Sequence, residues 1–166
     1  MDRSDFQKLY AYSDNCWRQL GDVLASADDA WNKPFETTSK WNTIRLLAAH
    51  SIAAEERMIS FRLLNIDLPL TYDQRAGDDW DSVYRDHKTV RAQTYAYLES
   101  LTDNEITDRE IVIPATVFPI GSTRADALFH IFNHENYHRG EIISALQRLG
   151  FDPPNFDYIL LKDKDM

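Results

Sequence analysis

The sequence predicts an all-α protein: a four-helix bundle with a long irregular connection before the last helix. Four segments of similar length carry apolar residues with a period of about 3.6 positions, which is typical of helices that bury one face. Prolines and glycines that end helices lie between or after these segments. The chain has 166 residues, of which 43% are hydrophobic, so we expect a single domain over residues 1–166.

The first helix is expected over about residues 5–27. On a helical wheel its apolar side chains fall on one face together with Ser13. Cys16 shares that face, so we interpret it as a small buried side chain rather than a reactive thiol. The predicted face consists of Phe6, Leu9, Tyr10, Cys16, Trp17, Leu20 and Leu24.

The second helix is expected over about residues 41–64. Hydroxyl residues at positions 37–39 are candidate N-caps, and Pro69 prevents continuation. A single histidine, His50, lies within the apolar face of this helix. That face consists of Leu46, Leu47, His50, Ala54, Met58, Phe61 and Leu64.

The third helix is expected to begin at Asp78 or Asp79, because a carboxylate is favourable at a helix N-terminus. Residues 105–122 then mix β-branched side chains with prolines and a glycine, which predicts a loop with room for a short hairpin. A connection of this length is typical of a lid or a crossover. The third helix's apolar face is Trp80, Val83, Tyr84, His87, Val90, Thr94, Leu98 and Leu101.

The fourth helix is expected to begin near Ser122 or Thr123 and to end at Gly150, a favoured residue after a helix C-terminus. Two prolines at positions 153–154 support this end. The tail, residues 151–161, is too apolar for a free end. We expect it to pack on the bundle or on a partner.

Charge and composition exclude several function classes. Lys and Arg total 18 against 27 for Asp and Glu, a net charge of −9, which argues against nucleic acid and against an anionic membrane surface. No apolar run approaches the roughly 20 residues that cross a bilayer. One cysteine and a start without a secretory signal predict a reducing compartment, so we expect a cytoplasmic protein.

Three histidines in the predicted fourth helix, His130, His134 and His138, follow one another at intervals of four. Side chains at i and i+4 lie one turn apart on the same face, so two imidazoles can bind one ion without backbone rearrangement. The wheel turns His134 and His138 towards the apolar stripe and His130 away from it. His130 is therefore expected to be the outer member.

A third ligand has to come from another helix, because a site that binds firmly normally uses three or more protein groups. His50 lies on an apolar face, where an unpartnered imidazole costs about 1–3 kcal/mol. A single core histidine is, however, more often hydrogen-bonded structure than a ligand. His87 lies on an equivalent face, so spacing alone leaves both His50 and His87 open.

Two segments of the chain resemble the DinB/YfiT-like superfamily of metalloproteins. The segment HIFNHENYHRGEIISALQRLGFDPPNFD resembles the family's last helix, and TIRLLAAHSIAAEERM resembles its second. Glu141 departs from the family pattern, which usually has glutamine there, and adds a charge near the site. The family pattern N-H-x-x-x-H-R-G is matched by Asn133, His134, His138, Arg139 and Gly140.

The resemblance implies that His50, His134 and His138 bind a divalent metal ion and that His87 belongs to the core or supports the ligands. Three imidazoles do not decide between zinc, nickel and manganese. Relatives include transferases and isomerases that use a low-molecular-weight thiol such as bacillithiol, mycothiol or glutathione. Many relatives form homodimers, so the resemblance implies a small-molecule substrate and a homodimer.

An open tris-histidine site would lower the pKa of a bound water or thiol, which predicts a metal-dependent transferase or hydrolase. Glu135 is a catalytic candidate, as general base or as a group that orients a ligand; the interpretation we favour is an ion pair with Arg139, four residues on. Arg57 could anchor an anionic substrate group or extend its charge into solvent.

Two other function classes fit the same residues. One is a non-catalytic, stress-responsive metal-binding or dimerisation bundle in which water or a fourth protein group, such as Glu141 or His130, fills the remaining coordination positions. The other is a metal-free bundle that binds an apolar ligand among aromatic side chains, although such side chains more often form core. The aromatic residues concerned are Trp17, Trp41, Trp80, Tyr84 and Phe132.

Overall fold

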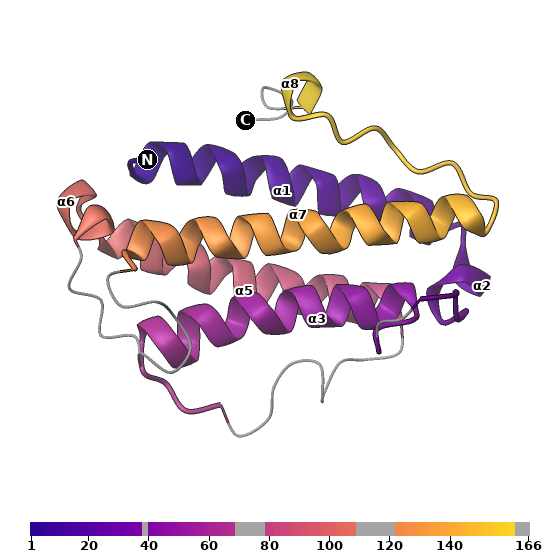
Figure 1. Ribbon diagram of the computed structural model, residues 1–166, viewed down its shortest axis with the longest axis horizontal. Helices are drawn as coiled ribbons and strands as arrows, with labels where there is room; N and C mark the ends of the chain where they lie inside the picture. The colour runs from indigo at the N-terminus through magenta and orange to yellow at the C-terminus, as the bar shows by residue number, and fades with distance from the viewer. Residues whose placement is uncertain (38–39, 69–78, 109–121, 162–166) are drawn as a thin grey trace.

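The structure, a computed structural model, describes residues 1–37, 40–68, 79–108 and 122–161. Its long helices lie side by side along one axis (Figure 1), and the described residues contain no β-strand, so the predicted all-α bundle is confirmed. The long elements are α1 (Arg3–Leu24), α3 (Ile44–Glu56) with its π-helical continuation η1 (Arg57–Leu63), α5 (Trp80–Ser100) and α7 (Arg124–Arg148). The short ones are α2 (Asp28–Trp31), α6 (Asp103–Thr107) and α8 (Tyr158–Leu161).

Capping side chains set the starts of α1 and α7. Asp2 accepts a hydrogen bond from the backbone of Asp5, whose carboxylate bonds back to the backbone of Asp2, and Thr123 and Asp126 form the same capping box. Such a cap contributes about 1 kcal/mol. Because Asp2 is the cap, α1 begins two residues earlier than predicted and also ends three residues earlier. The predicted start of α7 is confirmed.

The second long helix begins later than the sequence predicts. The side chain of Thr43 accepts a hydrogen bond from the backbone of Leu46 at 3.1 Å, so α3 starts at Ile44 rather than near Trp41. The predicted caps were therefore wrong for Thr37, and the other two, residues 38–39, lie outside the described residues.

After Glu56 the backbone of this helix becomes π-helical, with bonds such as Leu64 N to Ile59 O spanning five residues at 2.9 Å. A wider turn rotates every later side chain relative to an α-helical wheel. Phe61 and Leu64, predicted on the buried face, are therefore 47% and 44% exposed.

Asp79 begins α5 as predicted, through a 2.8 Å bond from the backbone of Ser82. The connection after α5 begins with the short helix α6, whose N-terminus is capped by a capping box between Thr102 and Glu105. The predicted loop is therefore wrong at residues 105–107. The predicted hairpin falls in residues 109–121, which lie outside the described part of the chain.

The chain leaves α7 through Gly150, whose φ of +89° belongs to the left-handed region that favours glycine. The tail then returns along the bundle, where Phe151 and Phe156 pack against the core. Tyr12 donates a hydrogen bond to the carbonyl of Phe156 at 2.5 Å. The predicted exit and the predicted packing of the tail are both confirmed.

The core consists of two apolar clusters with a buried polar layer between them along the bundle axis. One cluster includes Trp17, Leu20, Leu47, Ile52, Val83, Ile142 and Leu146. The other includes Phe6, Tyr10, Ile59, Leu98, Leu128 and Ile131. The layer takes its side chains from all four long helices: Ser13, Glu55, His87, Arg91 and Glu135, each less than 5% exposed.

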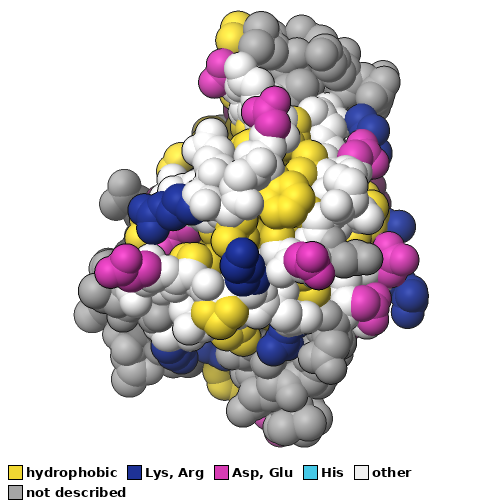
Figure 2. Space-filling model, turned by 90° about the vertical axis from the view of Figure 1, so that its right-hand side faces the viewer, with side chains coloured by type: hydrophobic (Ala, Val, Ile, Leu, Met, Phe, Trp, Pro, Cys, Tyr) yellow, Lys and Arg dark blue, Asp and Glu magenta, His cyan; other side chains and the backbone are white. Residues whose placement is uncertain are grey.

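The surface carries charges of both signs. On the end of the bundle near α2, Figure 2 shows Lys and Arg side chains interspersed with Asp and Glu and with small hydrophobic areas. Among the described residues no helix is both long enough and apolar enough to cross a membrane.

Candidate metal centre

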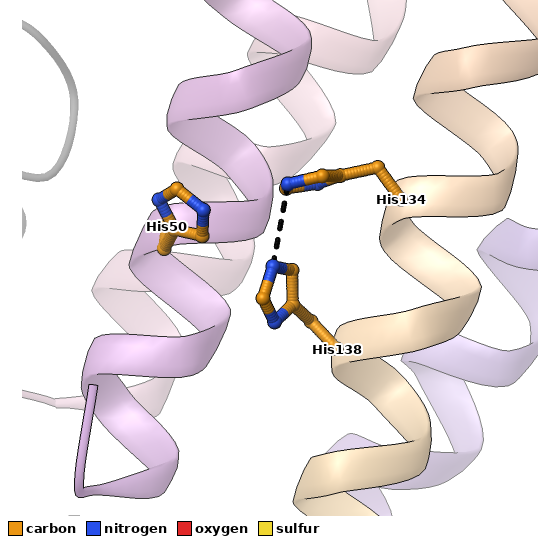
Figure 3. Close-up of side chains that lie close together, drawn as sticks. All are labelled: His50, His134 and His138. Atoms are coloured by element: carbon orange, nitrogen blue, oxygen red, sulfur yellow. Dashed lines mark hydrogen bonds between the residues drawn. The ribbon is translucent and has the colours of Figure 1, made fainter. Parts of the chain in front are cut away.

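Three histidines from two helices point towards a common space (Figure 3). His50 comes from α3, and His134 and His138 come from successive turns of α7. Their ring centroids are 4.5 Å apart for His134 and His138, 4.8 Å for His50 and His138, and 5.1 Å for His50 and His134. One nitrogen from each ring lies within 4.8 Å of the others. His50 thus lies with the histidine pair of α7, whereas spacing alone had left both His50 and His87 open as the third member.

The donor geometry fits a metal ion. The Nε2 atoms of His134 and His138 are 3.3 Å apart. Two imidazole nitrogens bound at about 2.0–2.1 Å to one tetrahedral ion would be separated by about 3.3 Å. One nitrogen of His50 lies within 4.8 Å of the ligand atoms of this pair, so a movement of its ring towards them would complete the set. The three residues could therefore hold one divalent ion.

Glu141 lies behind His138, one turn further along α7. Its Oε2 is 2.6 Å from Nδ1 of His138; the His138 side chain is buried and that of Glu141 is partly buried. A carboxylate on the far nitrogen fixes the tautomer of a histidine ligand, so that Nε2 is left to bind a metal ion. The residue that departs from the family pattern is therefore in contact with a candidate ligand.

Trp41 covers the other side of the cluster. Its ring stacks on the imidazole of His50 at a centroid distance of 3.7 Å and an interplanar angle of 21°, and it meets His138 edge-on at 5.7 Å. From the sequence, Trp41 was only one of several aromatic side chains that could bind an apolar ligand. In the structure its ring packs against the His50 imidazole and limits the positions that this imidazole can take.

The electrostatics favour a neutral imidazole at His134. Burial lowers the pKa of His134 to about 4, and the neighbouring His138 and His130 lower it too. The neutral ring has the lone pair that a metal ion requires. His130 is exposed, with its ring 5.7 Å from that of His134, as expected for the outer member.

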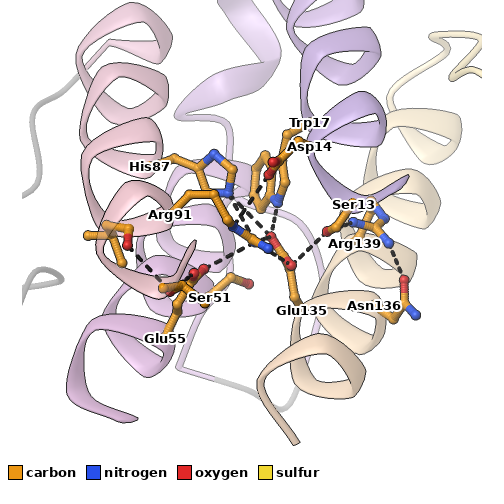
Figure 4. Close-up of polar contacts among 12 residues, drawn as sticks. Ser13, Asp14, Trp17, Ser51, Glu55, His87, Arg91, Glu135, Asn136 and Arg139 are labelled. Carbon is orange, nitrogen blue, oxygen red and sulfur yellow. Dashed lines mark hydrogen bonds and ion pairs between the residues drawn. The ribbon is translucent and has the colours of Figure 1, made fainter. Parts of the chain in front are cut away.

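The polar layer lies next to the histidines and is centred on Arg91 (Figure 4). Its guanidinium donates to both carboxylate oxygens of Glu135 on α7, at 2.8 and 2.9 Å, and lies 3.1 Å from Glu55 on α3. Its Nε lies 3.3 Å from Asp14 on α1. One side chain of α5 therefore ties the three other long helices together.

Glu135 is held inside this layer. Its carboxylate accepts bonds from Ser13 at 2.7 Å, from the indole of Trp17, and twice from Arg91. These four bonds fill the roughly four acceptor positions of a carboxylate. Burial raises the pKa of Glu135, but Arg91 and His87 outweigh burial and hold that pKa well below its usual range.

These contacts bear on both sequence interpretations of Glu135. The favoured pairing with Arg139 is wrong in its partner, because the guanidinium in contact with Glu135 is that of Arg91, and Arg139 donates to Ser13 and Asn136 instead. An ionised carboxylate with every acceptor position in use is also unsuited to the role of a general base.

His87 belongs to the buried layer and not to the tris-histidine cluster. Its Nε2 lies 3.4 Å from both Glu135 and Arg91. Arg57, the other catalytic candidate, is half-buried at the first residue of η1. Seven helical residues separate it from His50, about 10 Å along the axis, so its side chain would act at the edge of the site.

The buried ionic layer was not predicted from the sequence. Glu55 and Arg91 were not singled out, although both lie among residues of apolar faces. A signal was available, because three predicted helices each place a charged side chain towards the core near their middle. Buried charges of this kind require partners, and opposite signs on different helices predict that they meet.

Fold and site together define a helical-bundle protein with a candidate tris-histidine metal site between two helices. The model of the DinB family matches residues 1–165, and the chain belongs to that family. Neither a comparison with curated proteins nor one with solved structures finds a match.

Proposed function

We propose that this DinB family protein binds one divalent metal ion through His50, His134 and His138 and uses its open coordination positions to activate a thiol or water nucleophile. The observation that carries the proposal is the 3.3 Å separation of two Nε2 atoms on α7, with the His50 ring facing them from α3. Zinc, nickel and manganese are the candidate ions, and imidazole donors suit the first two particularly well.

The surroundings of the cluster support an open site. His50 and His134 are half-buried, so a small molecule can approach them from solvent. Glu141 engages the Nδ1 of His138, which makes it an orienting group rather than a fourth ligand. An open site with three protein ligands is typical of catalytic zinc, whereas structural sites are closed by four.

A bound divalent ion would supply a lowered pKa for a coordinated water or thiol. Other properties of the site keep one histidine ligand neutral, orient another and shield a third from water. The buried environment keeps His134 neutral, Glu141 holds the tautomer of His138, and Trp41 excludes water from one face of His50. The low-molecular-weight thiol, the small-molecule substrate and the homodimer stay predictions.

Elemental analysis of protein purified without an affinity tag tests the metal site. We expect about one divalent ion per chain, and we expect the His134→Ala/His138→Ala double variant to lack it. The exposed His130→Ala variant is the matched control and should keep the ion. Full metal content in the double variant, with its helical content unchanged by circular dichroism, would refute the site.

A second experiment separates catalysis from a purely structural ion. Turnover of electrophilic substrates should require the metal, and should require an added thiol as well if the nucleophile is a thiol rather than water. The alternative function, a non-catalytic metal-binding or dimerisation bundle, has one observation in its favour: the histidines come from α3 and α7, so an ion would tie these helices together. A screen with bacillithiol, mycothiol and glutathione that finds no turnover, together with a large metal-dependent rise in the unfolding midpoint, would favour that alternative.

A further inference from the structure

A single nitrogen of Arg91 occupies the centre of a second donor set. Its Nη2 lies 2.8 Å from Glu135, 3.1 Å from Glu55 and 3.4 Å from Nε2 of His87 (Figure 4). These three partners come from α7, α3 and α5. All of the side chains concerned are less than 5% exposed. The guanidinium is therefore enclosed by the three groups, as a bound cation would be.

The three partners are also the kinds of group that bind metal ions. One donor atom each from Glu55, His87 and Glu135 lies within 4.8 Å of the others, the same limit that the tris-histidine cluster meets. Carboxylates and an imidazole that project inward from different helices are the ligands of metal centres in helical bundles. Such an oxygen-rich set suits manganese and also accepts zinc.

The layer also contains a polar atom without a partner. Nδ1 of His87 is buried and has no hydrogen bond among the described residues. His87, Arg91 and Asp14 line a pocket of about 270 Å³ between α1 and α5. This pocket lies on helices other than those that carry the tris-histidine cluster, and of the three donors His87 lines it.

We propose that Glu55, His87 and Glu135 form a second cation site, in which the guanidinium of Arg91 takes the place of a divalent ion. An arginine side chain cannot lose its charge in a protein, so it blocks this site permanently. Arg91 thereby limits the protein to one metal ion. The statement about one ion rests on the proposed function, whereas the second site does not.

Removal of Arg91 should expose the site. Arg91→Ala leaves two buried carboxylates without their cation, and an uncompensated buried charge is strongly unfavourable. A divalent ion would restore the balance and would fit the space that the long side chain vacates. Arg91→Lys keeps a positive charge at this position and is the matched control.

The experiment counts bound ions by equilibrium dialysis with Mn²⁺ and, separately, with Zn²⁺. We expect Arg91→Ala to bind one more ion per chain than the wild-type protein, and Arg91→Lys to bind no more than wild type. Adding Glu135→Gln to Arg91→Ala should remove the additional ion. In the His134→Ala/His138→Ala background, Arg91→Ala should still bind one ion.

Thermal unfolding covers the case in which Arg91→Ala is unstable without an ion. Its midpoint should rise on addition of Mn²⁺ or Zn²⁺, and the rise should persist in the His134→Ala/His138→Ala background. The proposal is overturned if Arg91→Ala takes up no additional ion, or if it stays unfolded in the presence of both metals. A wild-type protein that binds no ion would contradict the proposed function only. The second site would still be tested by whether Arg91→Ala binds an ion that the wild-type protein does not.

Discussion

The Oε2 atom of Glu141 lies 2.6 Å from Nδ1 of His138, whose Nε2 lies 3.3 Å from that of His134. One carboxylate is thus linked through a single imidazole to the point where the candidate ligands meet. A carboxylate in this position makes a histidine a more basic ligand than an amide would. Glu141 is therefore expected to strengthen metal binding in this chain.

Glu141→Gln should weaken metal binding by about 10-fold and Glu141→Ala by about 100-fold, the range found for groups that support metal-bound histidines. Glutamine can still accept from Nδ1, whereas alanine leaves the ring without a partner. Competition with a chelator measures both affinities. Glu36→Gln is the control, because Glu36 is exposed and lines the same pocket as Glu141. Equal affinities for all four proteins would contradict an orienting role for Glu141.

His87→Ala should leave the metal content of the purified protein unchanged, since His87 lies in the buried layer with Arg91 and Glu135. His50→Ala should lose the ion. Elemental analysis of both variants, after their helical content has been checked, decides between the two histidines. If His87→Ala empties the site and His50→Ala does not, His50 is the wrong third ligand.

Two glycines should respond in opposite directions to replacement by alanine. A Cβ at Gly21 would lie 2.7 Å from Nε1 of Trp80, whose ring is stacked against Trp17 and Tyr84 and has little freedom to move. We expect Gly21→Ala to destabilise the protein by about 1–3 kcal/mol. Outside its own stretch of helix, no atom of the described residues lies within 4 Å of such a Cβ at Gly140, so Gly140→Ala should stabilise its helix by roughly 0.5–1 kcal/mol.

Denaturant unfolding of the metal-free variants measures both changes. A Gly140→Ala variant less stable than wild type would mean that this glycine has a role beyond its helix.

The stability of the protein should fall at high pH partly through Tyr12. Burial raises the pKa of Tyr12 to about 12, and the nearby Cys16 raises it too. Because the folded-state pKa is higher than the unfolded value of about 10, the contribution is complete below pH 10. It is lost as the pH rises through about 12, where the hydroxyl that bonds to Phe156 becomes ionised.

The free energy of unfolding should therefore decrease more steeply between pH 10 and 12 in wild type than in Tyr12→Phe. Denaturant titrations across this range give both slopes, and the comparison removes the effect of other buried tyrosines, which are present in both proteins. Identical slopes would show that Tyr12 does not titrate in the folded protein as described.

The helices were largely predictable because their starts and ends depend on residues close in sequence. Asp79, Thr123 and Gly150 act through the backbone of their own helix. The sequence predicted Gly150 and located the other two to within one residue, with Asp78 and Ser122 as the alternatives. The second helix was predicted less well. Its change to π-helical geometry after Glu56 alters the angle between successive side chains, and the sequence pattern around Glu56 did not predict this change.

The candidate site was predictable in part. The spacing of His134 and His138 determines that their rings share a face, because this follows from helix geometry alone. The choice between His50 and His87 depends on which helix packs beside the histidine face of α7, and on whether its histidine lies level with His134 and His138 along the bundle axis. The sequence pattern left that choice open, and only the resemblance to a family favoured His50.

The all-helical chain and the histidine pair on one helix face follow from the amino-acid sequence, since both properties arise from contacts within a few residues. The meeting of His50 with this pair, and the link that Arg91 makes between Glu55 and Glu135, depend on how the helices pack. These contacts connect residues that are distant along the chain. They are fixed by how four amphipathic helices pack around one axis, and each helix alone carries no information about its neighbour's register.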